Sequence, residues 1–337
     1  MSTNNLDRKQ LLLDVSKADA HLISANGRPG RPWLISCVAA MKTMVEVVKK
    51  IISVISKGDI LARKKYSMTE ARIRRFIKEG RGKGVGPNYK PWHMVSDVPS
   101  LGRVHRPYGN KTRRQHHLLS DNEYFAFLLF EWDDNIVDIR EQYPFIDRRE
   151  TMEIAARHGI RHPVDPQSGA LWVITTDFLL TIRNVNGTSL IARTVKQAET
   201  LGNKRTLEKL EIERRLCERH HVEWKILTNQ QLKNQFTANL AWIYDNNVLD
   251  LDSPVSIADE ILCKEIARIK SAEPYVPIKN ACRIIDERIG WSKGDALAGL
   301  RRLLWRKRIT TNLNVPKLSD LPISEFEIAK GNLSHEE

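Results

Sequence analysis

Apolar positions recur with strand and helix periods along the middle of the chain. They predict, in order, a helix over 121–132, strands over 136–140, 172–181 and 189–196, a helix over 206–219 and a strand over 222–227. Asn184-Val185-Asn186-Gly187 separates the second and third strands, and Asn-Gly favours the positive φ angles of a hairpin turn. This region is therefore predicted to be a mixed α/β domain.

Helical patterns dominate after Asp250-Leu251-Asp252-Ser253-Pro254, which is a plausible boundary. Three helices are predicted over 256–269, 278–289 and 293–307, followed by the β-prone segment 309–311. This order suggests a small helical or winged-helix unit. Basic residues near the end of the third helix are weak evidence for DNA contact, because such residues also favour the helix dipole.

The first 66 residues are predicted to form an N-terminal extension. A Pro/Gly run at 27–32 precedes apolar positions spaced as in an amphipathic helix. These positions are Val38, Met41, Val45, Val48, Ile52 and Ile55. Such an apolar stripe is expected to be buried against the protein's own body, a partner or a membrane surface.

Ser67 and Glu70 have capping-box spacing before a short helix that ends at Gly80. The predicted parts are thus 1–66, 67–248 and 249–337.

Positive charge is concentrated in the first third of the chain. The 337 residues carry a formal charge of +13, and residues 1–117 alone hold 24 Lys and Arg against 8 Asp and Glu. This asymmetry suggests binding of a polyanion, although a solvated basic surface remains an alternative. Gly80–Pro87 lacks the order of a phosphate-binding loop and is interpreted as a flexible basic loop. Candidate contacts to a DNA backbone follow it: Arg103, His105, Arg106, Lys111, Arg113, Arg114, His116 and His117.

Cysteine usage and hydropathy limit the cellular context. The four cysteines are far apart and form no CxxC pair, so neither a zinc site nor a disulfide framework is indicated, which fits a reducing cytoplasm. The most apolar stretch, Trp33–Ile55, contains several charged residues. No uncharged run approaches the ~20 residues that span a bilayer, so we expect no membrane span.

A lone carboxylate in an apolar strand is the first sign of chemistry. Asp177 lies in the strand over 172–181, and Lys196 ends the next strand of the hairpin, so the fold brings the two together. Divalent-metal nucleases use such carboxylates with a lysine, but an ordinary ion pair at a strand end would show the same spacing. Glu123 has capping-box spacing after Ser120, and Glu213 lies on a charged helix, so each also has a purely structural interpretation.

Five segments together resemble the TnsA family of transposon endonucleases. They are Ile77–Gly82, His116–Asp121, Val137–Pro144, Thr176–Phe178 and Arg205–Glu211, which run in family order across about 67–245. The resemblance is looser over the C-terminal unit. Residues 1–66 have no counterpart in the family, whose start would fall near Met68.

The resemblance implies a restriction-endonuclease-like fold and Mg²⁺-dependent hydrolysis at the 5′ ends of a transposon, with Mn²⁺ expected to substitute. It places the catalytic carboxylates on Glu123 and Asp177, the catalytic lysine on Lys196 and a further acidic residue on Glu213. Metal ligands would be Glu123 and Asp177, with the Thr194 hydroxyl and the Val195 carbonyl as additional donors. Thr194 departs from the family's usual Gln, which leaves a second metal site in doubt.

The same resemblance implies particular partners. The expected ones are transposon-end DNA, a TnsB-like transposase that cuts the 3′ ends, and a TnsC-like ATPase regulator that the C-terminal unit contacts. Work on chromosomal DNA would place the protein in the bacterial cytoplasm, associated with the nucleoid. The alternative is a DNA-binding and assembly subunit with a decayed active site, for which the departure at Thr194 is the main support.

Overall fold

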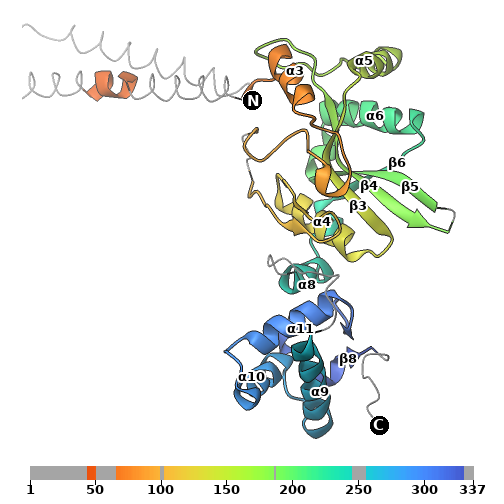
Figure 1. Cartoon of the computed structure of the whole chain (residues 1–337). Coiled ribbons are helices and arrows are strands. Elements are labelled where there is room, and N and C mark those ends of the chain that lie inside the picture. Colours follow the sequence, from red (N-terminus) through yellow and green to blue (C-terminus); the bar gives the residue numbers. More distant parts are fainter. Residues whose placement is uncertain (1–43, 51–65, 99–101, 186, 245–255, 330–337) are drawn as a thin grey trace, which may run out of the picture. The chain divides into compact units, whose positions relative to one another are not determined.

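The computed structural model describes residues 44–50, 66–98, 102–185, 187–244 and 256–329. The chain divides into two compact units, 1–65 and 66–337 (Figure 1). In the first unit residues 44–50 are helical, which agrees with the predicted amphipathic helix at that place. Four of its predicted stripe positions, Val38, Met41, Ile52 and Ile55, lie outside the described residues.

A four-stranded mixed sheet is the centre of the second unit. Its strands are β3 (Ile136–Phe145), β4 (Ile174–Asn184), β5 (Gly187–Lys196) and β6 (Glu223–Thr228), in the order β3-β4-β5-β6. β3 pairs antiparallel with β4, and β4 with β5, whereas β5 and β6 are parallel. Asn184 pairs with Gly187, so the predicted hairpin is confirmed. The parallel pair is joined through α6 (Lys204–Arg219).

Helices cover both faces of this sheet, α4 (Asp121–Trp132) on one side and α5 (Arg148–Arg157) with α6 on the other (Figure 1). Successive residues of a strand point to opposite faces. Phe178 and Leu180 accordingly pack into the core that contains α4, while Leu179 packs with Cys217 of α6. Burial on both faces explains why this part of β4 is a continuous apolar run instead of an alternating one.

Several local predictions were wrong in detail. α3 (Glu70–Lys78) is capped by Thr69, whose side chain accepts from the Arg72 N–H, while the Ser67 hydroxyl donates to Asp165 at 2.8 Å. β3 extends five residues beyond the predicted end, and α5, α7 (Asn229–Leu232) and α8 (Gln235–Ile243) were not predicted. In β3 the buried residues Glu141 and Gln142 interrupt the apolar pattern, which hides the strand from a hydrophobic periodicity.

The glycine-rich segment 80–87 was interpreted as flexible, but it is a closed turn held by main-chain bonds. The Gly82 N–H donates to the Lys90 carbonyl at 2.6 Å, and the Lys90 N–H donates to the Lys83 carbonyl at 3.2 Å. Gly84 has φ +90°, and a Cβ there would lie 2.4 Å from the Asn88 carbonyl oxygen. Only glycine fits this turn without backbone movement.

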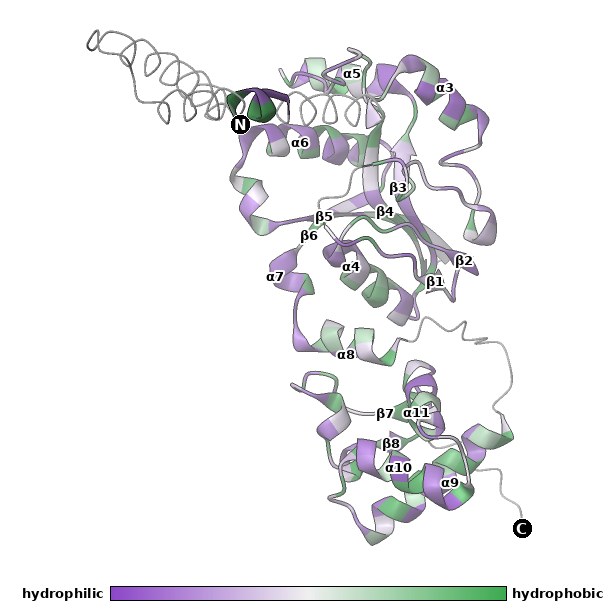
Figure 2. Ribbon diagram, turned by 90° about the vertical axis from the view of Figure 1, so that its left-hand side faces the viewer, coloured by the Kyte–Doolittle hydropathy of each residue, from purple (hydrophilic) through white to green (hydrophobic). Residues whose placement is uncertain are grey.

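The C-terminal part contains the three predicted helices, α9 (Ile257–Ala272), α10 (Ile278–Ile289) and α11 (Asp295–Trp305). β7 (Ile309–Thr310) pairs antiparallel with β8 (Glu327–Ile328). All three helices carry both apolar and polar residues, as amphipathic helices do (Figure 2). Winged-helix geometry and the boundary near residue 249 remain predictions, since 245–255 lie outside the described residues. No described helix is long and apolar enough to cross a membrane.

A buried ionic network attaches the hairpin of β1 (Tyr108–Gly109) and β2 (Arg114–Gln115) to β3. Arg114 donates to Glu141 at 2.7 Å, and His116 bonds the same carboxylate at 2.7 Å. Burial alone would raise the pKa of Glu141, but His116 and Arg114 hold it well below its usual range. Burial lowers the pKa of His116. Glu141 is thus an ionised carboxylate that depends on these partners.

Arg114→Ala is expected to lower the free energy of unfolding by about 3–5 kcal/mol, because it leaves the Glu141 charge buried without its guanidinium partner. Arg106→Ala, at an exposed arginine nearby, should change it by less than about 0.5 kcal/mol. Urea unfolding of both variants measures the difference. Equal effects would show that the network does not stabilise the fold.

Candidate active site

The site lies where the β4–β5 ladder opens. Pairing between these strands runs from Asn184–Gly187 to Phe178–Arg193, whereas β5 stays paired with β6 as far as Lys196–Thr228. Beyond Phe178, the Asp177 carboxylate accepts the Val195 N–H at 2.7 Å. A side-chain oxygen thus replaces a ladder partner and holds Asp177 against the end of β5.

Lys196 completes an ion pair at this opening. Its ammonium group donates to the Asp177 carboxylate and to the Val195 carbonyl, both at 3.0 Å. Burial opposes the charged form, but the carboxylates of Asp177, Glu213 and Glu123 together outweigh burial and raise the pKa of Lys196. The lysine is therefore a fixed positive charge at neutral pH, and the sequence prediction that the hairpin brings Asp177 and Lys196 together is confirmed.

Glu123 contributes to the start of its own helix, as its sequence context allowed, and it is also influenced by Asp177. In the first turn of α4 its N–H donates to the Ser120 hydroxyl at 3.2 Å, and its carboxylate accepts the Leu119 N–H at 2.9 Å. The side chain is also buried near Asp177. Burial first, and then the Asp177 charge, raise the pKa of Glu123 to about 7. A cation beside these two carboxylates would relieve that cost.

Gln142 is a site residue that sequence reasoning missed. It lies on β3 opposite Asp177, since the flanking pairs are Glu141–Phe178 and Tyr143–Thr176. Its amide group donates to Glu123 at 3.3 Å, and its backbone has φ +49°, in the left-handed region. Such a conformation costs on the order of 1 kcal/mol and clusters at functional sites. Nothing in the local sequence marks this residue, because a strand glutamine usually faces solvent.

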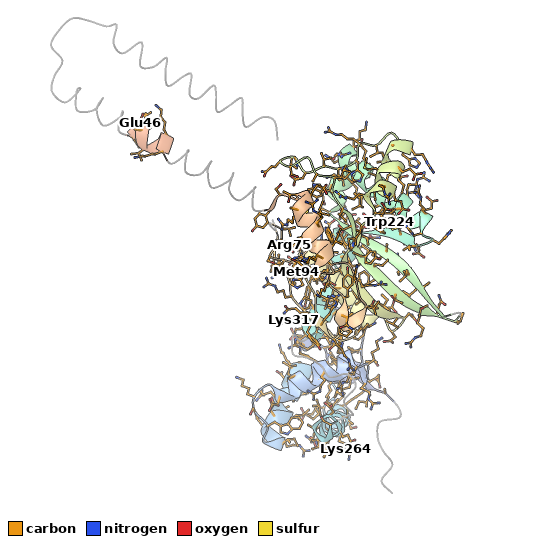
Figure 3. All side chains as sticks on the ribbon, turned by 45° about the horizontal axis from the view of Figure 1, so that its top comes forward. Glu46, Arg75, Met94, Trp224, Lys264 and Lys317 are labelled. Atoms are coloured by element: carbon orange, nitrogen blue, oxygen red, sulfur yellow. The ribbon has the colours of Figure 1, made fainter. Side chains whose placement is uncertain are left out.

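Glu213 is buried beneath the ion pair and not solvated on its helix. It accepts from the Thr194 hydroxyl and, at 2.9 Å, from the indole N–H of Trp224, which lies on β6 (Figure 3). Burial raises the pKa of Glu213 to about 7, with Lys196 opposing the rise and Asp177 adding to it. Trp224 was also missed by sequence reasoning, because only the folded chain places its ring over α6.

The arrangement around Thr194 corrects one expected metal ligand. Its side chain is 1% exposed, its hydroxyl donates to Glu213, and the same oxygen accepts from Trp224 at 3.1 Å. The hydroxyl is therefore used within the protein interior. The remaining donors are the Glu123 and Asp177 carboxylates and the Val195 carbonyl.

These donors fit a divalent ion that keeps several water ligands. No group of three or more His, Cys, Asp and Glu side chains among the described residues is arranged as a metal cage. Mg²⁺ does not require one, because it is usually bound through one or two carboxylates together with water and substrate phosphate. The high pKa of Glu123 beside Asp177 is the observation that favours a cation here.

The basic residues predicted to bind DNA separate into three groups by their exposure. Arg103, Arg106 and Arg113 are exposed, and Arg103 pairs with Asp121 at 2.9 Å. Lys111 and His117 are half-buried, with Lys111 donating to the Ile136 carbonyl at 2.6 Å. Arg114 and His116 are buried on Glu141 and cannot reach a phosphate backbone. The expectation for these two residues is therefore corrected: they anchor the segment that carries the exposed arginines.

Comparison with known proteins agrees with this geometry. Residues 133–229 match the family described as TnsA-like endonuclease N terminal, and residues 231–313 match TnsA endonuclease C terminal. The chain is 36% identical over 271 residues to the Transposon Tn7 transposition protein TnsA of Escherichia coli. This match covers 79% of the chain and 96% of that relative. The chain therefore belongs to the TnsA family of transposon endonucleases.

Proposed function

We propose that this endonuclease subunit of a transposition system hydrolyses the DNA strands at the 5′ ends of its transposon with Mg²⁺ as cofactor. The observation that carries the proposal is the cluster of Glu123, Asp177 and Lys196 at the opening of the β4–β5 ladder. An ordinary surface ion pair would not bury a second carboxylate beside the first. The family supports a nuclease, and the site chemistry supports a divalent ion.

Each residue of the cluster has a distinct role in this proposal. Glu123 and Asp177 would hold the ion, which would lower the pKa of a water molecule and offset negative charge on the phosphate. Lys196 is fixed by Asp177 and the Val195 carbonyl, so its charge faces the site and stabilises negative charge that develops on the phosphate oxygens. Gln142 and the Leu119 N–H orient Glu123. Glu213 positions Thr194 and thereby the end of β5.

The alternative of a decayed, non-catalytic subunit finds no support. The departure at Thr194 leaves Glu123, Asp177 and Lys196 in place, and the Thr194 hydroxyl is used to bind Glu213. A threonine at this position therefore changes the bonding beneath the site and removes none of the three groups proposed to act on DNA.

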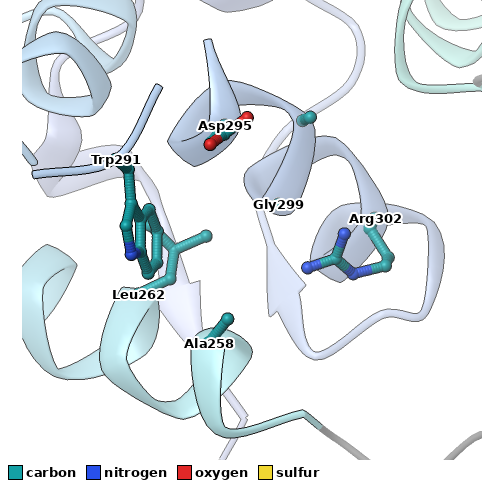
Figure 4. A pocket seen from close by; sticks show the side chains of 7 residues that line it. Ala258, Leu262, Trp291, Asp295, Gly299 and Arg302 are labelled. Atoms are coloured by element: carbon teal, nitrogen blue, oxygen red, sulfur yellow. The ribbon is translucent and has the colours of Figure 1, made fainter. Parts of the chain in front are cut away.

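We further propose that the protein acts with a TnsB-like transposase, which cuts the 3′ ends, and with a TnsC-like ATPase regulator. It would work in the bacterial cytoplasm, at the nucleoid. The surface offered for docking is an open pocket of about 280 Å³ between α9 and α11 (Figure 4). Its lining is Ala258, Leu262, Trp291, Asp295, Ala298, Gly299 and Arg302.

Asp177→Ala should abolish 5′-end cleavage while leaving TnsB-dependent 3′-end cleavage intact, because it removes a metal ligand without removing core packing. Joined products that still carry donor DNA should accumulate on a gel of transposition products. Glu153→Ala, at an exposed carboxylate of α5, is the matched control and should cut normally. Wild-type product ratios in Asp177→Ala would exclude this residue from the site.

Metal binding should strengthen as the pH rises through about 7, because Glu123 must lose its proton to bind the ion. Without metal, the raised pKa values of Glu123 and Glu213 mean that the folded state binds more protons than the unfolded state. Stability should therefore fall as the pH rises from about 4.5 to 7, by up to about 3 kcal/mol for each group.

Thermal unfolding with and without Mn²⁺ at pH 6 and pH 8 measures both effects. Glu123→Gln should lose most of the metal response, whereas Glu213→Gln should keep it and unfold at a higher temperature at pH 8. A full metal response in Glu123→Gln would contradict the proposed ligand.

Ala298→Glu should weaken binding of the TnsC-like ATPase by about tenfold or more, because it places a charge in the apolar part of the α9–α11 pocket. Cleavage with the TnsB-like transposase alone should be unchanged. The control is Lys264→Glu, an exposed residue of α9 outside the pocket lining (Figure 3). A pull-down with purified ATPase compares them, and equal binding by both variants would move the docking surface elsewhere.

A further inference from the structure

A second pocket, of about 310 Å³, lies beside the start of α6. Its lining is Arg161, Pro163, Val164, Pro166, Trp172, Arg205 and Lys209. The prolines, the valine and the indole make its surface apolar, while three cations surround it. Trp172 is 42% exposed, so one large ring is open to a ligand. The volume is at the lower end of the roughly 300–1,000 Å³ typical of small-ligand sites.

The cations of this pocket are poorly neutralised. Among the described residues, neither the Arg161 guanidinium nor the Lys209 ammonium has an acidic partner, and the Lys209 nitrogen lies 5.8 Å from the centroid of the Trp172 ring. Arg205 pairs with Glu208 at 2.8 Å and also donates to the Arg161 carbonyl. Burial, Arg205 and Lys196 together lower the pKa of Lys209. The pocket therefore favours an anion that also carries a flat apolar group.

This pocket is lined by α6 and by the segment that leads into β4, and both α6 and β4 also contribute residues to the nuclease site. Lys209 is one turn before Glu213 on α6, and Trp172 is two residues before β4, which carries Asp177. A DNA strand that places a phosphate at Asp177 and Lys196 therefore has a neighbouring nucleotide within reach of the pocket.

We propose that this pocket binds one unpaired nucleotide of the DNA substrate next to the cleaved phosphate, with the base on Trp172 and a phosphate on Arg161, Arg205 and Lys209. The proposal rests on the nuclease function above. A paired base does not offer its face, because it is stacked within the duplex, whereas an unpaired base stacks on any aromatic ring. An acidic peptide would match the cations but would leave the Trp172 face unused.

The first test measures binding without metal, so that it does not depend on catalysis. The full-length protein is titrated into a labelled oligothymidylate of about 8 nucleotides and followed by fluorescence anisotropy. Trp172→Ala should weaken binding about 5- to 100-fold, and Trp172→Phe, which keeps a stacking ring, by no more than about threefold. Arg161→Ala with Lys209→Ala should weaken binding and reduce its salt dependence. Tyr275→Ala and Lys225→Ala, at exposed residues outside the pocket, are the matched controls.

A second measurement locates the nucleotide. 2-Aminopurine is placed in turn at each position around the cleavage site of a transposon-end duplex. At one position the 2-aminopurine fluorescence should rise or fall when the protein binds. Trp172→Ala should abolish that change in fluorescence, and Trp172→Phe should retain it. Unchanged oligonucleotide affinity in Trp172→Ala, or competition by polyglutamate as strong as by oligothymidylate, would overturn the proposal. If metal-dependent cleavage fails while this binding persists, the nuclease assignment falls and the nucleotide site stands.

Discussion

The burial of Glu123 and Glu213 beside the Asp177–Lys196 ion pair is the constraint on which the rest of the site depends. Asp177 and Lys196 form a direct ion pair, but Glu123 and Glu213 are also buried nearby, and burial raises the pKa of both to about 7. One ammonium group, already paired with Asp177, cannot also compensate two buried glutamates. The cluster is therefore unfavourable for the fold alone, and a bound cation beside Glu123 and Asp177 would remove much of that cost.

β3 connects this cluster to the segment that carries the basic residues between Arg103 and His117. The Glu141 carboxylate is hydrogen-bonded to Arg114 of β2 and to His116 just after β2. The next residue of β3, Gln142, donates to Glu123. The strained backbone at Gln142 allows consecutive residues to serve both networks. The exposed arginines of residues 103–113 are consequently attached to the strand that orients Glu123, so the proposed DNA contacts and the proposed chemistry share one element.

On the other side of the sheet, α6 likewise contributes residues to two places. Glu213 faces the ion pair, and Lys209, one turn earlier, lines the pocket that contains Trp172. A nucleotide held there and a phosphate held at Lys196 would thus be positioned by a single helix and the strand that it covers. The α9–α11 pocket is lined by α9, α11 and Trp291 of the segment before α11, so the proposed partner docking and the proposed strand cleavage would use different residues.

Hydrophobic periodicity predicted α4, α6 and the three C-terminal helices, because each buries apolar residues at the period of its own backbone. The β4–β5 hairpin followed from strand periodicity together with the Asn-Gly turn. The adjacency of Asp177 and Lys196 followed from that hairpin, while Glu123 and Glu213 were assigned by the family resemblance. Tertiary structure alone decided the second half of β3, the roles of Gln142 and Trp224, and the burial of Arg114 and His116. The identity of a polar residue does not show whether its side chain faces water or a buried hydrogen-bond partner. Only the partner, which is distant in sequence, distinguishes the two environments.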